Sequence, residues 1–142
     1  MTTPQTHLPP HWIRRVLVLM DAPATHENQR LMQAWATAEG GEAKWNPLNS
    51  TLRLSGTVSW TDPVNYNSVG VCNYLYGFAG CAATALTMLQ KDWQGNAVYG
   101  GIVADLKNGS RTAEAIVERN DAEFSKWGTS PQLILDCLKT IP

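Results

Sequence analysis

One glutamate, Glu39, stands where a carboxyl group could act as an acid. It lies in the last turn of an amphipathic segment, and Gly40 and Gly41 follow it and end the helix. A helix C-terminus carries partial negative charge, which disfavours an ionised carboxylate there by up to about 1 kcal/mol. Trp35, one turn earlier on the same face, would disfavour ionisation further by excluding water. A carboxyl group kept protonated near neutral pH is what general acid catalysis requires.

Glu39 also has an ordinary interpretation, in which it is only the solvated end of a surface helix. The helix that would carry it is expected over residues 25–39, with Thr25 as its N-cap and the apolar side chains of Leu31, Met32 and Trp35 on its inner face. Both interpretations place Glu39 at the same point of the fold. They differ in whether the carboxyl faces bulk water or a substrate cleft.

Other catalytic chemistries find less support in the sequence. A thiol peptidase of the cell-wall type would have its histidine after the cysteine, but all three histidines precede Cys72. His7 and His11 are four residues apart, yet Pro9 and Pro10 separate them, so they share no helix face for a metal. Phosphate-binding glycine loops and nucleophile elbows are missing from the sequence. We therefore expect no metal and no cofactor.

The composition of the chain is that of one folded domain. It has 142 residues, 44% of them hydrophobic and 16% charged, with a net charge of −1. No Lys/Arg cluster indicates a nucleic-acid or membrane partner. Neither a signal peptide nor a membrane anchor is expected, and residues 1–9 are expected to form a loosely ordered arm. Three cysteines, Cys72, Cys81 and Cys137, are expected to be buried thiols, although a bridge such as Cys72–Cys81 is an alternative.

Apolar periodicity predicts a mainly helical chain with one polar insertion. Further helices are expected over residues 10–20, 76–93, 99–109, 111–120 and 131–141. Trp12, Trp35 and Trp93 lie on apolar stripes and are expected in the core, as are Phe78, Cys81, Ala85, Leu86 and Leu89. Residues 43–70 are instead rich in Asn, Ser, Thr, Gly and Pro, and the alternation in "TLRLSGTVSW" (residues 51–60) predicts a small hairpin.

Four short motifs occur in an order that resembles a known family. They are "AWATAEGG", "NPLN", "NYNSVGVCNY" and the aromatic-led segment "YGFAGCAATALTML". This order is similar to that of the lysozyme-like domains of phages that infect actinobacteria, and to that of bacterial glucosaminidases and lytic transglycosylases. The resemblance extends over residues 15–130. It implies a lysozyme-like fold of mainly α (α+β) class, a single domain over residues 1–142, with a small polar hairpin or loop lobe after the catalytic helix.

The resemblance also implies a site. Glu39 matches the catalytic acid, Asn67, Gly70 and Val71 match the substrate-cleft turn, and Tyr74 or Tyr76 matches the entry to the cleft helix. Aromatic rings expected to stack on sugars are those of Trp45, Trp60, Tyr66 and Tyr74. Gly40 stands where transglycosylases usually carry serine. No second carboxylate is evident, because Glu42 and Asp62 are the only acids nearby, so the stereochemistry stays open.

Two functions follow from this resemblance. The first is an enzyme, a muramidase or lytic transglycosylase that cleaves the glycan strands of peptidoglycan, with the substrate's own N-acetyl or 6-hydroxyl group completing the displacement. It would act from a phage virion, with other tail proteins as partners, or as an endolysin released to the bacterial cell wall. The second is a non-catalytic lysozyme-like module of a virion, serving assembly or glycan binding. An open groove beside Glu39 would favour the first.

Overall fold

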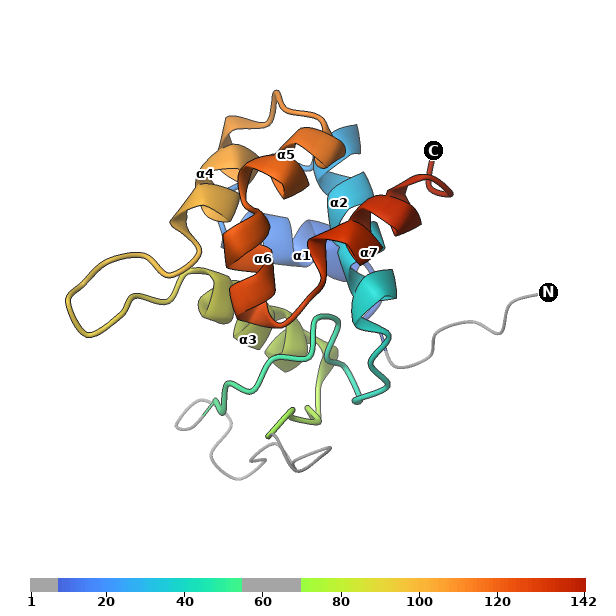
Figure 1. The fold of residues 1–142 in the computed structure, drawn as a ribbon. Helices are drawn as coiled ribbons and strands as arrows, with labels where there is room; N and C mark the ends of the chain where they lie inside the picture. Colours follow the sequence, from blue (N-terminus) through green and yellow to red (C-terminus); the bar gives the residue numbers. More distant parts are fainter. Residues whose placement is uncertain (1–7, 55–69) are drawn as a thin grey trace.

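The computed structural model describes residues 8–54 and 70–142, and this part of the chain is mainly helical (Figure 1). Its helices are α1 (Trp12–Leu19), α2 (His26–Glu39), α3 (Gly77–Met88), α4 (Gly100–Asn108), α5 (Ala113–Arg119), α6 (Asp121–Trp127) and α7 (Pro131–Leu138). No helix among these is long and apolar enough to cross a bilayer. The mainly α class predicted from the sequence is confirmed.

Local sequence signals explain several helix ends. The Thr25 hydroxyl accepts a hydrogen bond from the Asn28 amide at 3.1 Å and caps α2, which ends at Gly40 in the left-handed conformation. Ser130 caps α7 in the same way, with Pro131 in its first turn. Helix α5 begins at Ala113, after its N-cap Thr112, which is two residues later than the start predicted at residue 111.

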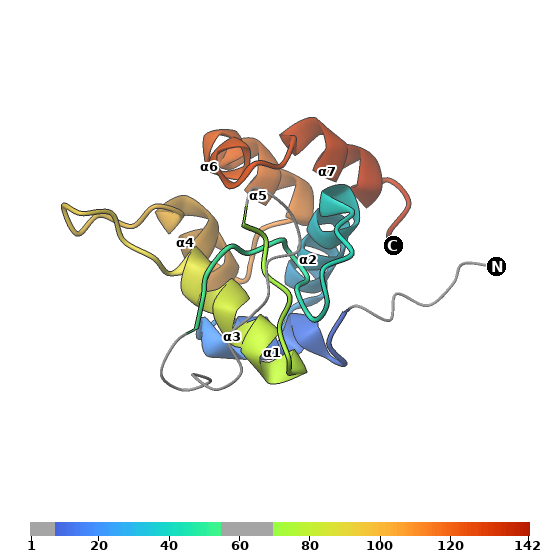
Figure 2. The same cartoon turned by 90° about the horizontal axis from the view of Figure 1, so that it is seen from below.

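Helix α2 lies at the centre of the helical body. It contacts α1, α5 and α7, while α1 also packs on α3 and α5 on α4 (Figures 1 and 2). Its buried face inserts Trp35 against Phe124 and Trp127 of α6, with ring centroids 4.7 and 5.0 Å apart. Edge-to-face packing of this kind stabilises the fold by about 0.5–1.5 kcal/mol beyond the contribution of the apolar surface that the rings bury. The C-terminal half of α2 is thus anchored to α6 by edge-to-face aromatic contacts.

Residues 40–54 and 70–76 form a polar layer without regular strands. The buried Asn46 side chain organises it, donating to the carbonyls of Ser50 at 2.9 Å and Cys72 at 2.8 Å and accepting from the Ser50 amide at 2.9 Å. The Tyr74 amide donates to the Lys44 carbonyl at 2.9 Å. The predicted hairpin over residues 51–60 is wrong for residues 51–54, which are irregular, and residues 55–60 lie outside the described residues.

Helix α3 separates this polar layer from the main core. Cys81, Ala85 and Met88 face the core, whereas Ala79 and Ala83 pack with Cys72 and Tyr74 of the polar layer. A Cβ atom at Gly80 would lie 1.6 Å from the Trp45 carbonyl oxygen, so only glycine allows the layer to approach the helix this closely. Cys72, Cys81 and Cys137 are free thiols, the first two buried.

The predicted helix over residues 76–93 extends five residues beyond the C-terminal end of the observed helix. Helix α3 ends at Met88, and four residues predicted to be buried are exposed. Phe78 is 61% exposed, Leu86 50%, Leu89 37% and Trp93 91%. Phe78 and Leu86 lie on the exposed face of α3, and Leu89 and Trp93 are exposed because the chain leaves the helix after Met88 and forms a separate loop.

A buried acid ties the later helices together. The Asp105 carboxylate of α4 accepts hydrogen bonds from Arg111 at 2.9 Å, from Arg119 at 3.1 Å and from the Asn120 amide at 2.8 Å. These cationic and amide donors hold its pKa below the ordinary value despite burial, which acts in the opposite direction. Asp105 is therefore a structural anion that links α4, α5 and the start of α6.

Candidate functional site

Glu39 does not face bulk water. Its side chain is half-buried at the end of α2, and both carboxyl oxygens have protein partners. The Thr129 hydroxyl donates to Oε1, and the Asn49 amide Nδ2 donates to Oε2 at 2.7 Å. The carboxyl thus joins the helix end, the polar layer and the α6–α7 connection. It is held in one orientation rather than left free on a surface.

Trp35 orients Glu39 through Thr129. Its indole Nε1 donates to the Thr129 hydroxyl oxygen at 2.9 Å, and that hydroxyl in turn donates its proton to Glu39. Trp35 is fully buried and Thr129 only 4% exposed, so this chain of two bonds is shielded from water. The sequence predicted Trp35 as core, which is confirmed. Its hydrogen-bonding role was not predicted.

The pKa of Glu39 is raised above its ordinary value. The largest cause is burial, which penalises the charged form. Hydrogen bonds from Thr129 and Asn49, together with the nearby indole N–H of Trp35, act in the opposite direction, because donors favour the carboxylate, but they do not cancel the effect of burial. Trp35 therefore has two opposing effects on the pKa of Glu39. Its apolar ring raises the pKa by excluding water, and its N–H lowers it. Its indole N–H partly offsets the desolvation to which its ring contributes.

The glycine pair has a geometric role beyond ending the helix. A Cβ atom on Gly41 would lie 1.8 Å from Oδ1 of Asn49, so the absence of a side chain there admits the Asn49 amide. Asn49 itself has a left-handed backbone with φ 57°, a conformation that asparagine tolerates better than most residues. Gly41 and the backbone of Asn49 together place a donor on Glu39 Oε2.

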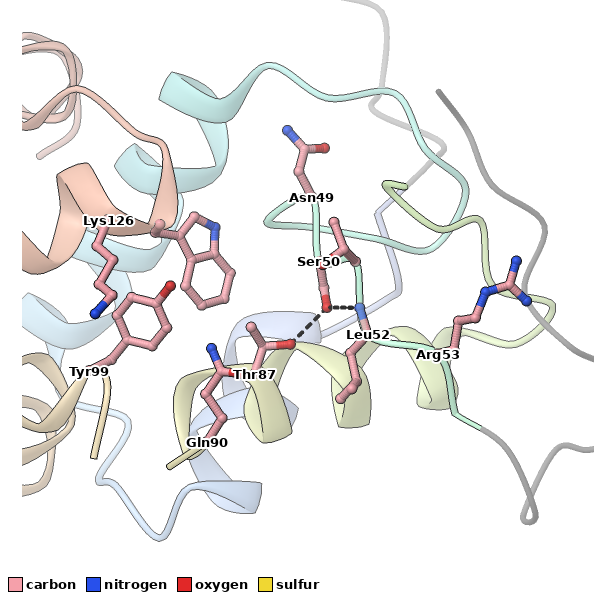
Figure 3. Close-up of a pocket in the computed structure, with 10 residues that line it drawn as sticks. Asn49, Ser50, Leu52, Arg53, Thr87, Gln90, Tyr99 and Lys126 are labelled. Carbon is pink, nitrogen blue, oxygen red and sulfur yellow. Dashed lines mark hydrogen bonds between the residues drawn. The ribbon is translucent and has the colours of Figure 1, made fainter. Parts of the chain in front are cut away.

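A pocket of about 580 Å³ lies beside this cluster (Figure 3). Figure 3 shows Tyr99 and Lys126 on one side and Asn49, Ser50 and Arg53 on the other, with Thr87 of α3 and Gln90, just after that helix, between them. The described residues that line it are Asn49, Ser50, Thr51, Leu52, Arg53, Thr87, Gln90, Tyr99, Lys126 and Trp127. Glu39 is not a lining residue. Asn49 both donates to the Glu39 carboxyl group and lines the pocket, so its side chain connects the two.

Two aromatic rings of the pocket were not predicted as site residues. The rings of Tyr99 and Trp127 are in contact in a tilted arrangement, with 5.1 Å between centroids, and Trp127 Nε1 donates to the Leu48 carbonyl at 2.9 Å. Trp127 also packs against Trp35, so the rings connect the pocket wall to the residue that orients Glu39. The only sequence signal was the high tryptophan content. Tryptophan content alone could not indicate that Trp35 and Trp127, which are far apart in the sequence, are in contact in the fold.

The predicted aromatic binding residues occupy other places. Trp45 is half-buried and packs against α3, where its ring lies 3.8 Å from the position of a Cβ on Gly77. Tyr74 is only 2% exposed and donates its hydroxyl proton to the Leu52 carbonyl at 2.5 Å. An exposed Tyr74 face for sugar stacking is therefore wrong, because this ring fills the core of the polar layer.

The predicted cleft turn is described only at its end. Gly70 has a left-handed backbone with φ 90°, and Val71 is 6% exposed. Tyr66, Asn67 and Trp60 lie outside the described residues. Their assignment to the site stays a prediction.

A second acid is not evident near Glu39. Glu42 is exposed, Asp62 lies outside the described residues, and no Asp or Glu occurs among the described residues that line the pocket. Across residues 8–54 and 70–142, no group of three His, Cys, Asp or Glu side chains could hold a metal ion. The chemistry of the described site thus depends on one carboxyl group with a raised pKa.

Comparison of the chain with protein-family models, with curated proteins and with solved structures gave no match.

Proposed function

We propose that this protein cleaves the glycan strands of peptidoglycan, as a muramidase or lytic transglycosylase, with Glu39 as the general acid. The observation that supports this is the Glu39 carboxyl group. It has a raised pKa, is oriented by Thr129 and Asn49, and lies one side chain away from a pocket with aromatic and polar walls. The order of sequence motifs that resembles lysozyme-like domains supports the same assignment.

In the proposed reaction, neutral Glu39 gives its proton to the glycosidic oxygen as the bond to the anomeric carbon breaks. Oε2 accepts from Asn49, a residue that also lines the pocket, whereas Oε1 accepts from the buried Thr129. With no acid in the described pocket lining, the substrate supplies the second group. Either its N-acetyl oxygen attacks the anomeric carbon and water later completes hydrolysis, or its 6-hydroxyl attacks and returns a proton to the Glu39 carboxylate.

The biological setting belongs to the same proposal. The motif resemblance is to domains of phages that infect actinobacteria, so the chain would open the host wall either from the virion tail or as a released endolysin. Its partners would then be peptidoglycan strands and, in the virion, other tail proteins.

A non-catalytic structural module is the second candidate, and one observation favours it. Both oxygens of Glu39 are bonded within the protein, and the carboxyl does not line the described pocket. A carboxyl group that only ties α2 to two loops would look the same. In that case the pocket would bind glycan without cutting it.

Purified actinobacterial cell walls provide the test. Wild-type protein should lower their turbidity and release fragments whose masses show a reducing or a 1,6-anhydro end. Glu39→Gln keeps the shape of the side chain and should abolish release, whereas Glu42→Gln, a change at an exposed acid three residues away, should not. Release by folded Glu39→Gln equal to wild type would exclude Glu39 as the acid. Binding without any release by wild type would favour the structural module.

A further inference from the structure

Trp93 is the most exposed large apolar side chain described, at 91%. It lies in the connection between α3 and α4, which projects away from the helical body in both views (Figures 1 and 2). Single exposed hydrophobic residues are common and need no function by themselves. What distinguishes Trp93 is the construction and position of the loop that carries it.

The loop is held in shape by its own hydrogen bonds. Asp92 Oδ1 accepts from the amides of Gln94 and Asn96, both at 2.9 Å, and the Asp92 carbonyl accepts from the Gly95 amide at 3.0 Å. Lys91 and Ala97 form a bridge between the two arms of the loop. Gly95 has φ 85°, a left-handed conformation that suits this turn. Trp93 is therefore presented by a preorganised turn, which reduces the ordering cost of binding through it.

The base of the loop forms part of the pocket wall. Gln90 and Tyr99, the residues at its two ends, both line the pocket, and the Val98 amide donates to the Gln90 carbonyl at 3.1 Å. A ligand that fills the pocket and extends beyond it at this edge would meet the loop. The loop that carries Trp93 thus begins and ends at the pocket wall.

The chemistry of the loop favours a sugar ring over a protein or a membrane. Around Trp93 the turn has no second large apolar side chain, since its other residues are Lys91, Asp92, Gln94, Gly95, Asn96 and Ala97. A protein interface or a bilayer would need a larger apolar patch to repay desolvation. A pyranose ring needs one flat aromatic face for its C–H groups and polar side chains beside it for its hydroxyls. Trp93 with Gln94 and Asn96 provides that combination.

We propose that Trp93 binds a sugar unit of a long glycan strand, outside the pocket that holds the units nearest to Glu39. The inference rests on the proposed function for the identity of the strand. If Trp93 binds such a unit, the preferred substrate is a polymer rather than a short oligosaccharide, because short chains would fill the pocket without reaching the loop.

Binding and cleavage are measured separately to test this. In a Glu39→Gln background, co-sedimentation with purified peptidoglycan sacculi should weaken roughly three- to tenfold on Trp93→Ala. Trp93→Phe should retain most of the affinity. As a control, Phe78→Ala removes another exposed aromatic ring, on α3, and should leave sacculus binding unchanged. In the active enzyme, Trp93→Ala should lower kcat/KM on sacculi and leave it unchanged on soluble oligosaccharides of two to four sugars.

Several outcomes would overturn the inference. Undiminished sacculus binding by Trp93→Ala would do so, as would an equal loss of kcat/KM on short and long substrates. Loss of binding to anionic phospholipid vesicles, with sacculus binding unchanged, would assign the loop to a membrane instead. Trp93-dependent binding to sacculi that wild-type protein never cleaves would support this inference while refuting the catalytic role of Glu39.

Discussion

Replacing Thr129 by valine tests the hydrogen-bond chain that orients Glu39. Valine has nearly the same shape as threonine, but it neither accepts from Trp35 nor donates to Glu39. The fully buried Trp35 N–H then lacks a partner, which costs about 1–3 kcal/mol. Loss of the bond to Glu39 adds to this, giving a total of about 2–4 kcal/mol. For a domain of this size the melting temperature should fall by roughly 5–15 °C.

The sign of the pH effect follows from the same bond. A hydrogen bond donated to Glu39 favours its charged form, so Thr129→Val should raise the Glu39 pKa further. Because the folded-state pKa is above the unfolded value, the contribution of Glu39 to stability is present at low pH and lost as pH rises through the folded pKa. The destabilisation by Thr129→Val should therefore be larger at pH 8 than at pH 4.

Urea unfolding at both pH values, with carbon-detected NMR titration of the Glu39 carboxyl, measures these effects. Thr129→Ser keeps the hydroxyl and should retain most of the stability and the wild-type pKa. A Thr129→Val protein that is as stable as wild type, with an unmoved Glu39 pKa, would refute the reasoning. It would mean that the hydroxyl bonds neither Trp35 nor Glu39 in solution.

Further predictions concern the groups around Glu39 and the buried Asp105. Gly41→Ala should displace the Asn49 amide and raise the Glu39 pKa, as NMR titration would show, since its Cβ would lie 1.8 Å from Asn49 Oδ1. Asn49→Ala should raise the same pKa and lower the free energy of unfolding by about 1–2 kcal/mol because alanine is strained at φ 57°; Asn49→Gly, which relieves the strain, should restore most of the stability but not the pKa. Asp105→Asn should cost about 1–3 kcal/mol at pH 7. Its effect in urea unfolding should shrink as pH falls through the lowered Asp105 pKa, and an effect that grows in acid would contradict the assignment.

The sequence predicted the helix that carries Glu39 because the signals for that helix are local. Thr25 caps its start, Gly40 ends it, and Trp35 is buried as its apolar spacing required. The partners of Glu39 could not be predicted in the same way. Asn49 is ten residues away and Thr129 ninety, and neither residue type nor spacing indicates that they meet.

The error at residues 89–93 has a local cause that periodicity alone does not reveal. The apolar stripe continues to Trp93, but the Asp92 side chain binds the amides of Gln94 and Asn96 and stabilises a turn instead of another helical turn. The error at Tyr74 has a different origin. A tyrosine can be buried when its hydroxyl has a partner, and the Leu52 carbonyl provides one through the folded polar layer.

The hydrogen bond from Thr129 to Glu39 also has a consequence for the order of folding. It closes a contact between residues ninety positions apart, and such long-range contacts are entropically costly to form early. During synthesis, Glu39 leaves the ribosome well before Thr129 and α7, which complete its surroundings. Until they dock, the carboxyl group would be more hydrated and its pKa closer to ordinary. Under the proposed function, a chain truncated before residue 129 should be a poor acid catalyst, so that the host in which it is made would meet active enzyme only after the last helices have been translated.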